Sequence, residues 1–172
     1  FFMRCLRLAL AATIVTACHD ETVQAPEVGS SRVMPGFRLE KLLGGAGGSD
    51  RRGQSINLRG AVAGFSNLAG GTRHAALWRQ GSFLDLGTLG GPNSNVQWPG
   101  QNDRGMVVGI SETAEDDSLD ESWSCKPFLL NSSAGKVCRG FYWEDNRMTA
   151  LPTFGGTHGF ATGINNLGQA VG

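Results

Sequence analysis

The chain has 172 residues, enough for one domain or a few small repeats, and its 15 basic and 15 acidic residues balance to a formal net charge of zero. This balance argues against a nucleic-acid-binding surface. The 26 glycines are about twice the usual share and follow no Gly-X-Y period, which excludes collagen and favours many tight turns.

The N-terminus is predicted to direct export. Basic residues precede the apolar run Leu8–Val15. At about 1.5 Å per residue this run is far too short for ~30 Å of hydrocarbon, so residues 1–17 are predicted to be a signal peptide. Val15-Thr16-Ala17-Cys18 resembles the lipobox of bacterial lipoproteins, with an ordinary secretory signal as the alternative. The resemblance implies acylation of Cys18 and attachment to a membrane through that lipid. Residues 18–38 are then a flexible tether.

Residues 39–172 are predicted to be a β-repeat domain because three kinds of anchor residue recur. They are an asparagine before a glycine turn, a glycine after an aliphatic pair, and a tryptophan that ends a short strand. In this order they are Asn57, Asn102 and Asn165; Gly64, Gly109 and Gly172; and Trp78 and Trp143. The asparagines and glycines recur after 45 residues and then after 63, which places an insertion of 18 residues between Gly109 and Trp143.

Each unit contains four short apolar runs of strand length, separated by glycine or Asn-Asp turns. In the first unit the runs are Ile56–Leu58, Ala61–Phe65, Ala75–Trp78 and Phe83–Leu86. Four strands in a period near 45 residues are typical of a β-propeller blade. We therefore predict an all-β fold of propeller-like antiparallel blades, with another β-repeat stack as the alternative. Because a propeller needs ~4–8 blades, about two and a half units suggest a truncated array.

The repeated phrases resemble those of the HAF repeat family of extracellular bacterial proteins. Residues 74–78 read HAALW and are similar to the family's HAFLW phrase, with Ala76 in place of phenylalanine. Residues 85–91 match DLGTLGG in full, and residues 102–111 are similar to the segment that follows, with Gln101 in place of the usual isoleucine. The resemblance covers roughly three quarters of the chain. It implies an exported repeat protein and supplies no catalytic residues.

Once the signal peptide is removed and Cys18 is acylated, the remaining thiols are Cys125 and Cys138. In an oxidising compartment they are predicted to form a disulfide. A zinc site is the disfavoured alternative, because it needs about four ligands and both His74 and His158 are distant along the chain.

The acidic loop Glu112–Glu121 is a candidate calcium site, with a solvated loop as the alternative. Its candidate ligands are Glu115, Asp116, Asp117 and Asp120. Trp98 and Trp123 lie outside the predicted strands and are candidate contacts for a carbohydrate or a peptide. His74 is expected to have a structural role, and Asp85 to accept backbone N–H bonds at a turn.

No G-x-S-x-G phrase and no recognisable triad occur in the chain. We therefore expect a bacterial surface lipoprotein with a binding or structural role, with no cofactor other than the candidate calcium ion and with an unidentified polysaccharide or protein ligand. The alternative is a fragment of an extracellular hydrolase that acts on glycans.

Overall fold

The computed structural model describes residues 41–129 and 134–172, which lie in one compact unit, Glu40–Gly172. This compact domain is all-β, as predicted, and is built of antiparallel sheets. The signal peptide, Cys18 and the tether over residues 18–38 fall outside the described residues.

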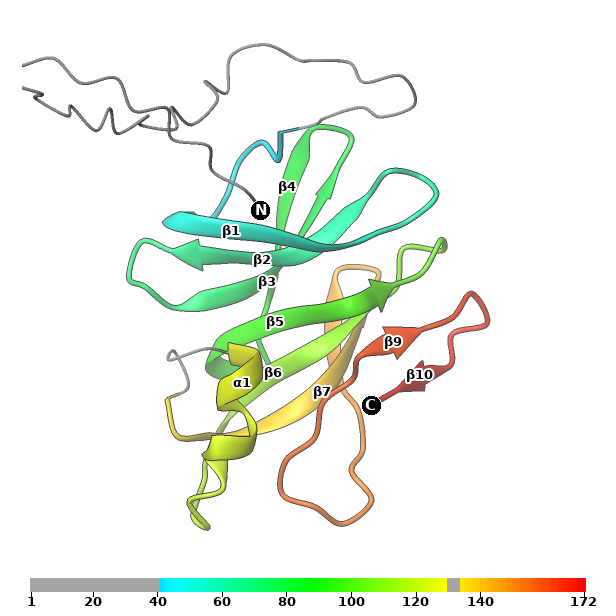
Figure 1. The fold of residues 1–172 in the computed structure, drawn as a ribbon. Coiled ribbons are helices and arrows are strands. Elements are labelled where there is room, and N and C mark those ends of the chain that lie inside the picture. Colours follow the sequence, from blue (N-terminus) through cyan, green and yellow to red (C-terminus); the bar gives the residue numbers. More distant parts are fainter. Residues whose placement is uncertain (1–40, 130–133) are drawn as a thin grey trace, which may run out of the picture. The chain divides into compact units, whose positions relative to one another are not determined.

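Two four-stranded sheets make up most of the domain, and in each sheet the strands pair in chain order (Figure 1). We call β1–β4 the first unit and β5–β8 the second; neither sheet closes on itself. A two-stranded hairpin, β9–β10, begins a third unit. The strands are β1 (Gly47–Ile56), β2 (Val62–Leu68), β3 (Arg73–Arg79), β4 (Ser82–Gly87), β5 (Gly90–Gln101), β6 (Val107–Asp116), β7 (Lys136–Glu144), β8 (Arg147–Ala150), β9 (Gly163–Ile164) and β10 (Ala170–Val171).

In the first two units the apolar runs locate six strands, β2 to β4 and β6 to β8, but the first run of the first unit is placed wrongly. Ile56 is the last residue of β1, and Asn57 and Leu58 belong to the turn that follows. Most residues of β1 and β5 are polar or glycine, so no apolar run indicates these two strands. Their polar groups find partners in neighbouring strands. For example, the side-chain amide of Gln101 donates to the carbonyls of Ser55 and Ala61.

The core lies between the two sheets and takes residues from both. Side chains from β2, β3 and β4 pack against side chains from β5, β6 and β7. Burial of each large apolar side chain contributes about 1.5–3 kcal/mol. The buried members are Ala63, Ala75, Leu77, Leu86, Val96, Val107, Phe141 and Trp143.

The predicted turn asparagines form a ladder that joins consecutive units. In the β5–β6 turn, Asn102 Oδ1 accepts the N–H groups of Arg104 and Met106 at 3.0 Å each. Its Nδ2 donates to the carbonyl of Asn165 at 2.9 Å, and Asn57 Nδ2 donates in the same way to the carbonyl of Asn102 at 3.1 Å. The asparagine spacing therefore marks both a turn and a bond between units.

A second rung runs beside the first, one residue further along each turn. The Leu58 N–H donates to Asp103 Oδ1 at 2.8 Å, and the Asp103 N–H donates to Asn166 Oδ1 at 2.9 Å. Hydrogen bonds from Asn166 and from the Leu58 N–H hold the pKa of Asp103 below its ordinary value. The turns of the first two units thus share two bonds, and those of the second and third units share three, because Asn166 Nδ2 also donates to Asp103 Oδ2.

The insertion in the second unit lies between β6 and β7 and contains a 3-10 helix, Ser122–Ser124, and the short helix α1, Lys126–Leu129. A disulfide joins Cys125 to Cys138 of β7, as predicted. Both cysteines pack with Ile110 and Leu129 in a second, smaller core. The disulfide therefore fastens the insertion to the sheet.

Candidate functional site

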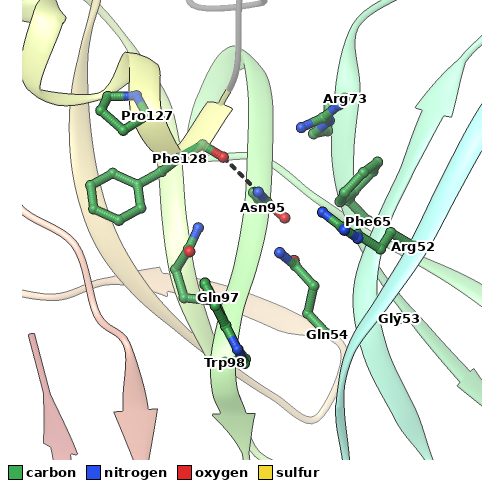
Figure 2. A pocket seen from close by; sticks show the side chains of 10 residues that line it. All are labelled: Arg52, Gly53, Gln54, Phe65, Arg73, Asn95, Gln97, Trp98, Pro127 and Phe128. Carbon is green, nitrogen blue, oxygen red and sulfur yellow. Dashed lines mark hydrogen bonds between the residues drawn. The ribbon is translucent and has the colours of Figure 1, made fainter. Parts of the chain in front are cut away.

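A pocket opens where the first sheet meets β5 and α1, and its side chains converge from four strands and the helix (Figure 2). Its volume is about 350 Å³, near the lower end of the usual range for small-molecule sites. The lining residues are Arg52, Gly53 and Gln54 of β1, Phe65 of β2, Arg73 of β3, Asn95, Gln97 and Trp98 of β5, and Pro127 and Phe128 of α1.

Side chains of β5 enter the pocket because a strand alternates its faces. Val96 points into the core between the sheets, so its neighbours Asn95 and Gln97 point the other way. Asn95 Nδ2 donates to the Phe128 carbonyl at 2.6 Å, which ties the strand to α1. This polar alternation within residues 95–97 is the sequence signal that could have located the pocket.

Four polar atoms of the lining are buried without a hydrogen-bond partner among the described residues. They are Gln54 Oε1, Arg73 Nη1, Asn95 Oδ1 and Gln97 Nε2. A buried polar group that makes no hydrogen bond costs about 1–3 kcal/mol. A concentration of such atoms in one pocket indicates that a ligand or ordered water satisfies them.

Arg73 gives the pocket a positive charge. Its guanidinium lies 3.7 Å from the centre of the Phe65 ring, donates from Nε to Asn67, and stands 3.8 Å from Asp50. Burial lowers the pKa of Arg73, and Asp50 opposes this while the neighbouring Arg52 adds to it. An arginine keeps its proton through a shift of this kind, so the unpaired Nη1 remains a charged donor.

Trp98 stands at the edge of this polar pocket with 70% of its surface exposed. Trp123 is equally exposed, at 69%, but does not line the pocket. Of the two tryptophans singled out in the sequence, only Trp98 therefore lies at a candidate site.

The structure does not gather the four carboxylates of the candidate calcium site. Asp116 pairs with Lys136, and Asp117 turns inward to accept the N–H groups of Leu119 and Ser122. In residues 41–129 and 134–172, one group of three or more His, Cys, Asp or Glu side chains has ligand atoms within 4.8 Å of one another. It consists of Cys125, Cys138 and His158. Calcium binding by Glu115, Asp116, Asp117 and Asp120 stays a prediction.

The sequence argument against a zinc site assumed that His158 lies far from the cysteines, and its place in this group shows that this assumption is wrong. His158 is 20 positions from Cys138 and 33 from Cys125, yet its ring contacts both. Separation along the chain was a poor guide because the segment after β8 returns to the edge of the insertion. Local spacing alone gives no signal for such a contact.

His74 and Asp85 have the structural roles predicted for them. His74 Nδ1 lies 2.9 Å from both carboxylate oxygens of Asp85, and the Gly87 N–H donates to Asp85 Oδ1 at 2.8 Å. Burial raises the pKa of Asp85, but the hydrogen bonds from His74 and Gly87 outweigh it, and the pKa is lowered. The pair fixes the end of β4.

We expect Asp85→Asn to make the free energy of unfolding less dependent on pH. A lowered carboxyl pKa stabilises the fold above the unfolded-state pKa of about 3.9, and this contribution disappears as the pH falls through the folded pKa. Urea unfolding at about pH 7 and pH 3 tests this. The difference in the free energy of unfolding between the two pH values should be smaller in the variant than in the wild type. An equal difference would contradict the assignment.

A second, shallower depression of about 530 Å³ lies over the turn ladder. It is lined by Ile56, Asn57, Leu58, Gln101, Asn102, Asp103, Ile164, Asn165 and Asn166. Most polar groups here already bond one another across the units, as described above, and among the described residues Gln101 Oε1 is the one buried side-chain atom of this lining without a partner. It is therefore the weaker candidate for a ligand site.

No family model, curated protein or solved structure matches this chain in comparisons with known proteins. The resemblance to the HAF repeat family therefore stays a prediction. Within the part of the chain that the structure describes, every helix is too short or too polar to traverse a bilayer.

Proposed function

We propose that this protein is a binding protein that holds a glycan in the pocket between the first sheet and β5. The observation that carries the proposal is the set of four unpaired buried polar atoms beside the exposed ring of Trp98. A sugar ring matches both features. Each hydroxyl donates and accepts a hydrogen bond, and the apolar face of the ring stacks on an indole.

The lining favours a sugar over an apolar ligand because amides and guanidinium groups contribute so much of it. Gln54, Asn95 and Gln97 present carboxamides, which supply donors and acceptors without carrying charge. Arg52 and Arg73 add positive charge, which suits a carboxylate-bearing sugar such as a uronate.

The lining also supports binding over hydrolysis. Glycoside hydrolysis ordinarily uses a pair of carboxylic acids, one on each side of the scissile bond. The residues that line the pocket include no aspartate or glutamate, and no serine, cysteine or histidine nucleophile. The alternative of a glycan hydrolase therefore finds no support in this pocket.

The proposed setting is a surface lipoprotein of the HAF repeat type, anchored through Cys18, in which each four-stranded sheet is one blade of a propeller. In support of blades, the two sheets have the same topology and their β1–β2 and β5–β6 turns bond in the same way. A disulfide within the domain suits an exported protein.

We expect Trp98→Ala to weaken glycan binding about tenfold or more, because loss of a stacking face worth about 1.4 kcal/mol changes an equilibrium constant tenfold. The test is calorimetry of the full chain with neutral oligosaccharides and with uronate oligosaccharides. Arg52→Ala should weaken uronate binding and leave neutral binding nearly unchanged.

Trp123→Ala is the matched control, since it removes an equally exposed indole away from the pocket. It should bind as the wild type does. Equal losses in both tryptophan variants, or no binding of either class of oligosaccharide by the wild type, would refute the proposal.

A further inference from the structure

His158 brings an imidazole to two cysteines that the disulfide already holds together. Its Nδ1 lies 3.2 Å from Cys125 Sγ and accepts the backbone N–H of Cys138 at 3.0 Å. The Sγ atoms and the histidine ligand atom all lie within 4.8 Å of one another. Two thiolates and an imidazole are the ligand types that zinc prefers.

The other ring nitrogen of His158 faces a buried carboxylate. Nε2 lies 3.5 Å from Asp117 Oδ1, makes no hydrogen bond to any described residue, and belongs to a side chain only 10% exposed. The Asp117 side chain is 1% exposed. A histidine that ligates a metal through one nitrogen commonly directs its other N–H at a carboxylate, which orients the ring.

The tautomer follows from these partners. Because Nδ1 accepts the Cys138 N–H, it carries a lone pair, and the ring proton belongs on Nε2, opposite Asp117. In this tautomer the Nδ1 lone pair can ligate a metal ion in place of the Cys138 N–H.

Comparison of the units shows that the repeat fold itself does not require a histidine here. Asn93 Oδ1, in β5, accepts the N–H of Arg73 in the first unit at 3.0 Å, across 20 positions of the chain. In the second unit, His158 Nδ1 accepts the Cys138 N–H at 3.0 Å, also across 20 positions. An asparagine therefore suffices as the side-chain acceptor for this backbone N–H. The second unit has instead two ligands at these positions, and its insertion adds Cys125 and Asp117.

We propose that Cys125, Cys138 and His158 form a redox-gated zinc site, with Asp117 as the positioning residue for the imidazole. In the oxidised chain both sulfur atoms are bonded to each other and cannot act as thiolate ligands. A dithiol reductant donates two electrons and two protons, its own sulfurs join in a disulfide, and two cysteine thiols form. Zn²⁺ then displaces the two thiol protons to solvent and binds both sulfurs and Nδ1, whose lone pair leaves its hydrogen bond with the Cys138 N–H, and water takes the fourth position.

The test is zinc titration of the full chain against a chromophoric chelator, in a background where Cys5 and Cys18 are replaced by serine to remove the other thiols. A phosphine serves as reductant; it becomes the phosphine oxide, and water supplies its oxygen and the two thiol protons. We expect one Zn²⁺ per reduced chain and at least about a hundredfold weaker binding by the oxidised chain. Cobalt in place of zinc should give a thiolate-to-metal absorption band in the reduced chain.

His158→Asn is the decisive variant because it keeps an acceptor for the Cys138 N–H, as Asn93 is for the Arg73 N–H. We expect it to weaken zinc binding at least about tenfold, and Asp117→Asn to weaken it about tenfold through loss of the positioning carboxylate. His74→Asn, which removes a distant imidazole, should have no effect. Circular dichroism checks that each reduced variant keeps its β signal.

Three results would overturn the proposal. They are equal zinc affinity in the oxidised and reduced chains, equal affinity in His158→Asn and the wild type, and a cobalt spectrum without the thiolate band. Binding by a reduced chain that has lost its fold would appear as the second of these, because an unfolded chain does not need His158 in place.

Discussion

Gly109→Ala is expected to destabilise the protein by about 3 kcal/mol, since it forces an atom into a closely packed contact between strands. A Cβ at Gly109 would lie 2.1 Å from the Asn95 carbonyl oxygen and 2.9 Å from the Phe141 ring. Cβ atoms essentially never approach other atoms so closely, so β5 would have to move away from β6. Urea unfolding followed by circular dichroism measures the loss.

Gly70→Ala provides the control, because a Cβ there would meet nothing within 4 Å. It should change the free energy of unfolding by less than about 0.5 kcal/mol. If Gly109→Ala proved as stable as Gly70→Ala, the close approach of β5 to β6 would be wrong.

Asn102→Asp is expected to cost about 2 kcal/mol by breaking the bond between the second and third units. The carboxylate keeps the acceptor for the Arg104 and Met106 N–H groups but lacks the Nδ2 donor to the Asn165 carbonyl. It also sets a negative oxygen against that carbonyl at a residue only 4% exposed. Urea unfolding again supplies the measurement.

Asn165→Asp is the control that distinguishes the contribution of the turn from that of the bond between units. Asn165 has the same turn bonds, to the N–H groups of Leu167 and Gln169, but its Nδ2 donates only to the Gln169 side chain. This exposed variant should lose less than about 0.5 kcal/mol. Equal losses in Asn102→Asp and Asn165→Asp would mean that the bond between units contributes nothing.

The repeat anchors were predictable from sequence because each has one physical requirement that recurs in every unit. Gly64, Gly109 and Gly172 all lie where a Cβ would come within about 2.1 Å of a backbone carbonyl oxygen. Only glycine fits such a position. The turn asparagines recur because each unit needs the same side-chain acceptor for the turn. The all-β class follows from equally local patterns, and the Cys125–Cys138 disulfide from the predicted export of the chain.

The pocket was not predictable as a whole, because its residues share no local pattern. Gln54, Arg73 and Asn95 come from three strands, and β5, which supplies three lining residues as β1 does, reads as a polar loop. Trp98 was found because an indole outside an apolar run stands out by itself. His158 was dismissed for its distance from the cysteines, and only the return of the chain after β8 brings them together.

The ladder of turn asparagines also determines how motion spreads along the chain. Its asparagine bonds run from a donor in one unit to an acceptor in the next, as in Asn57 to Asn102 and Asn102 to Asn165, while Asn166 Nδ2 donates back to Asp103 Oδ2. The N–H of Leu58 is likewise held by Asp103 of the following unit. Local opening of one unit therefore releases groups in the unit before it. Cooperativity passes between nearest neighbours, as in a one-dimensional chain of coupled elements.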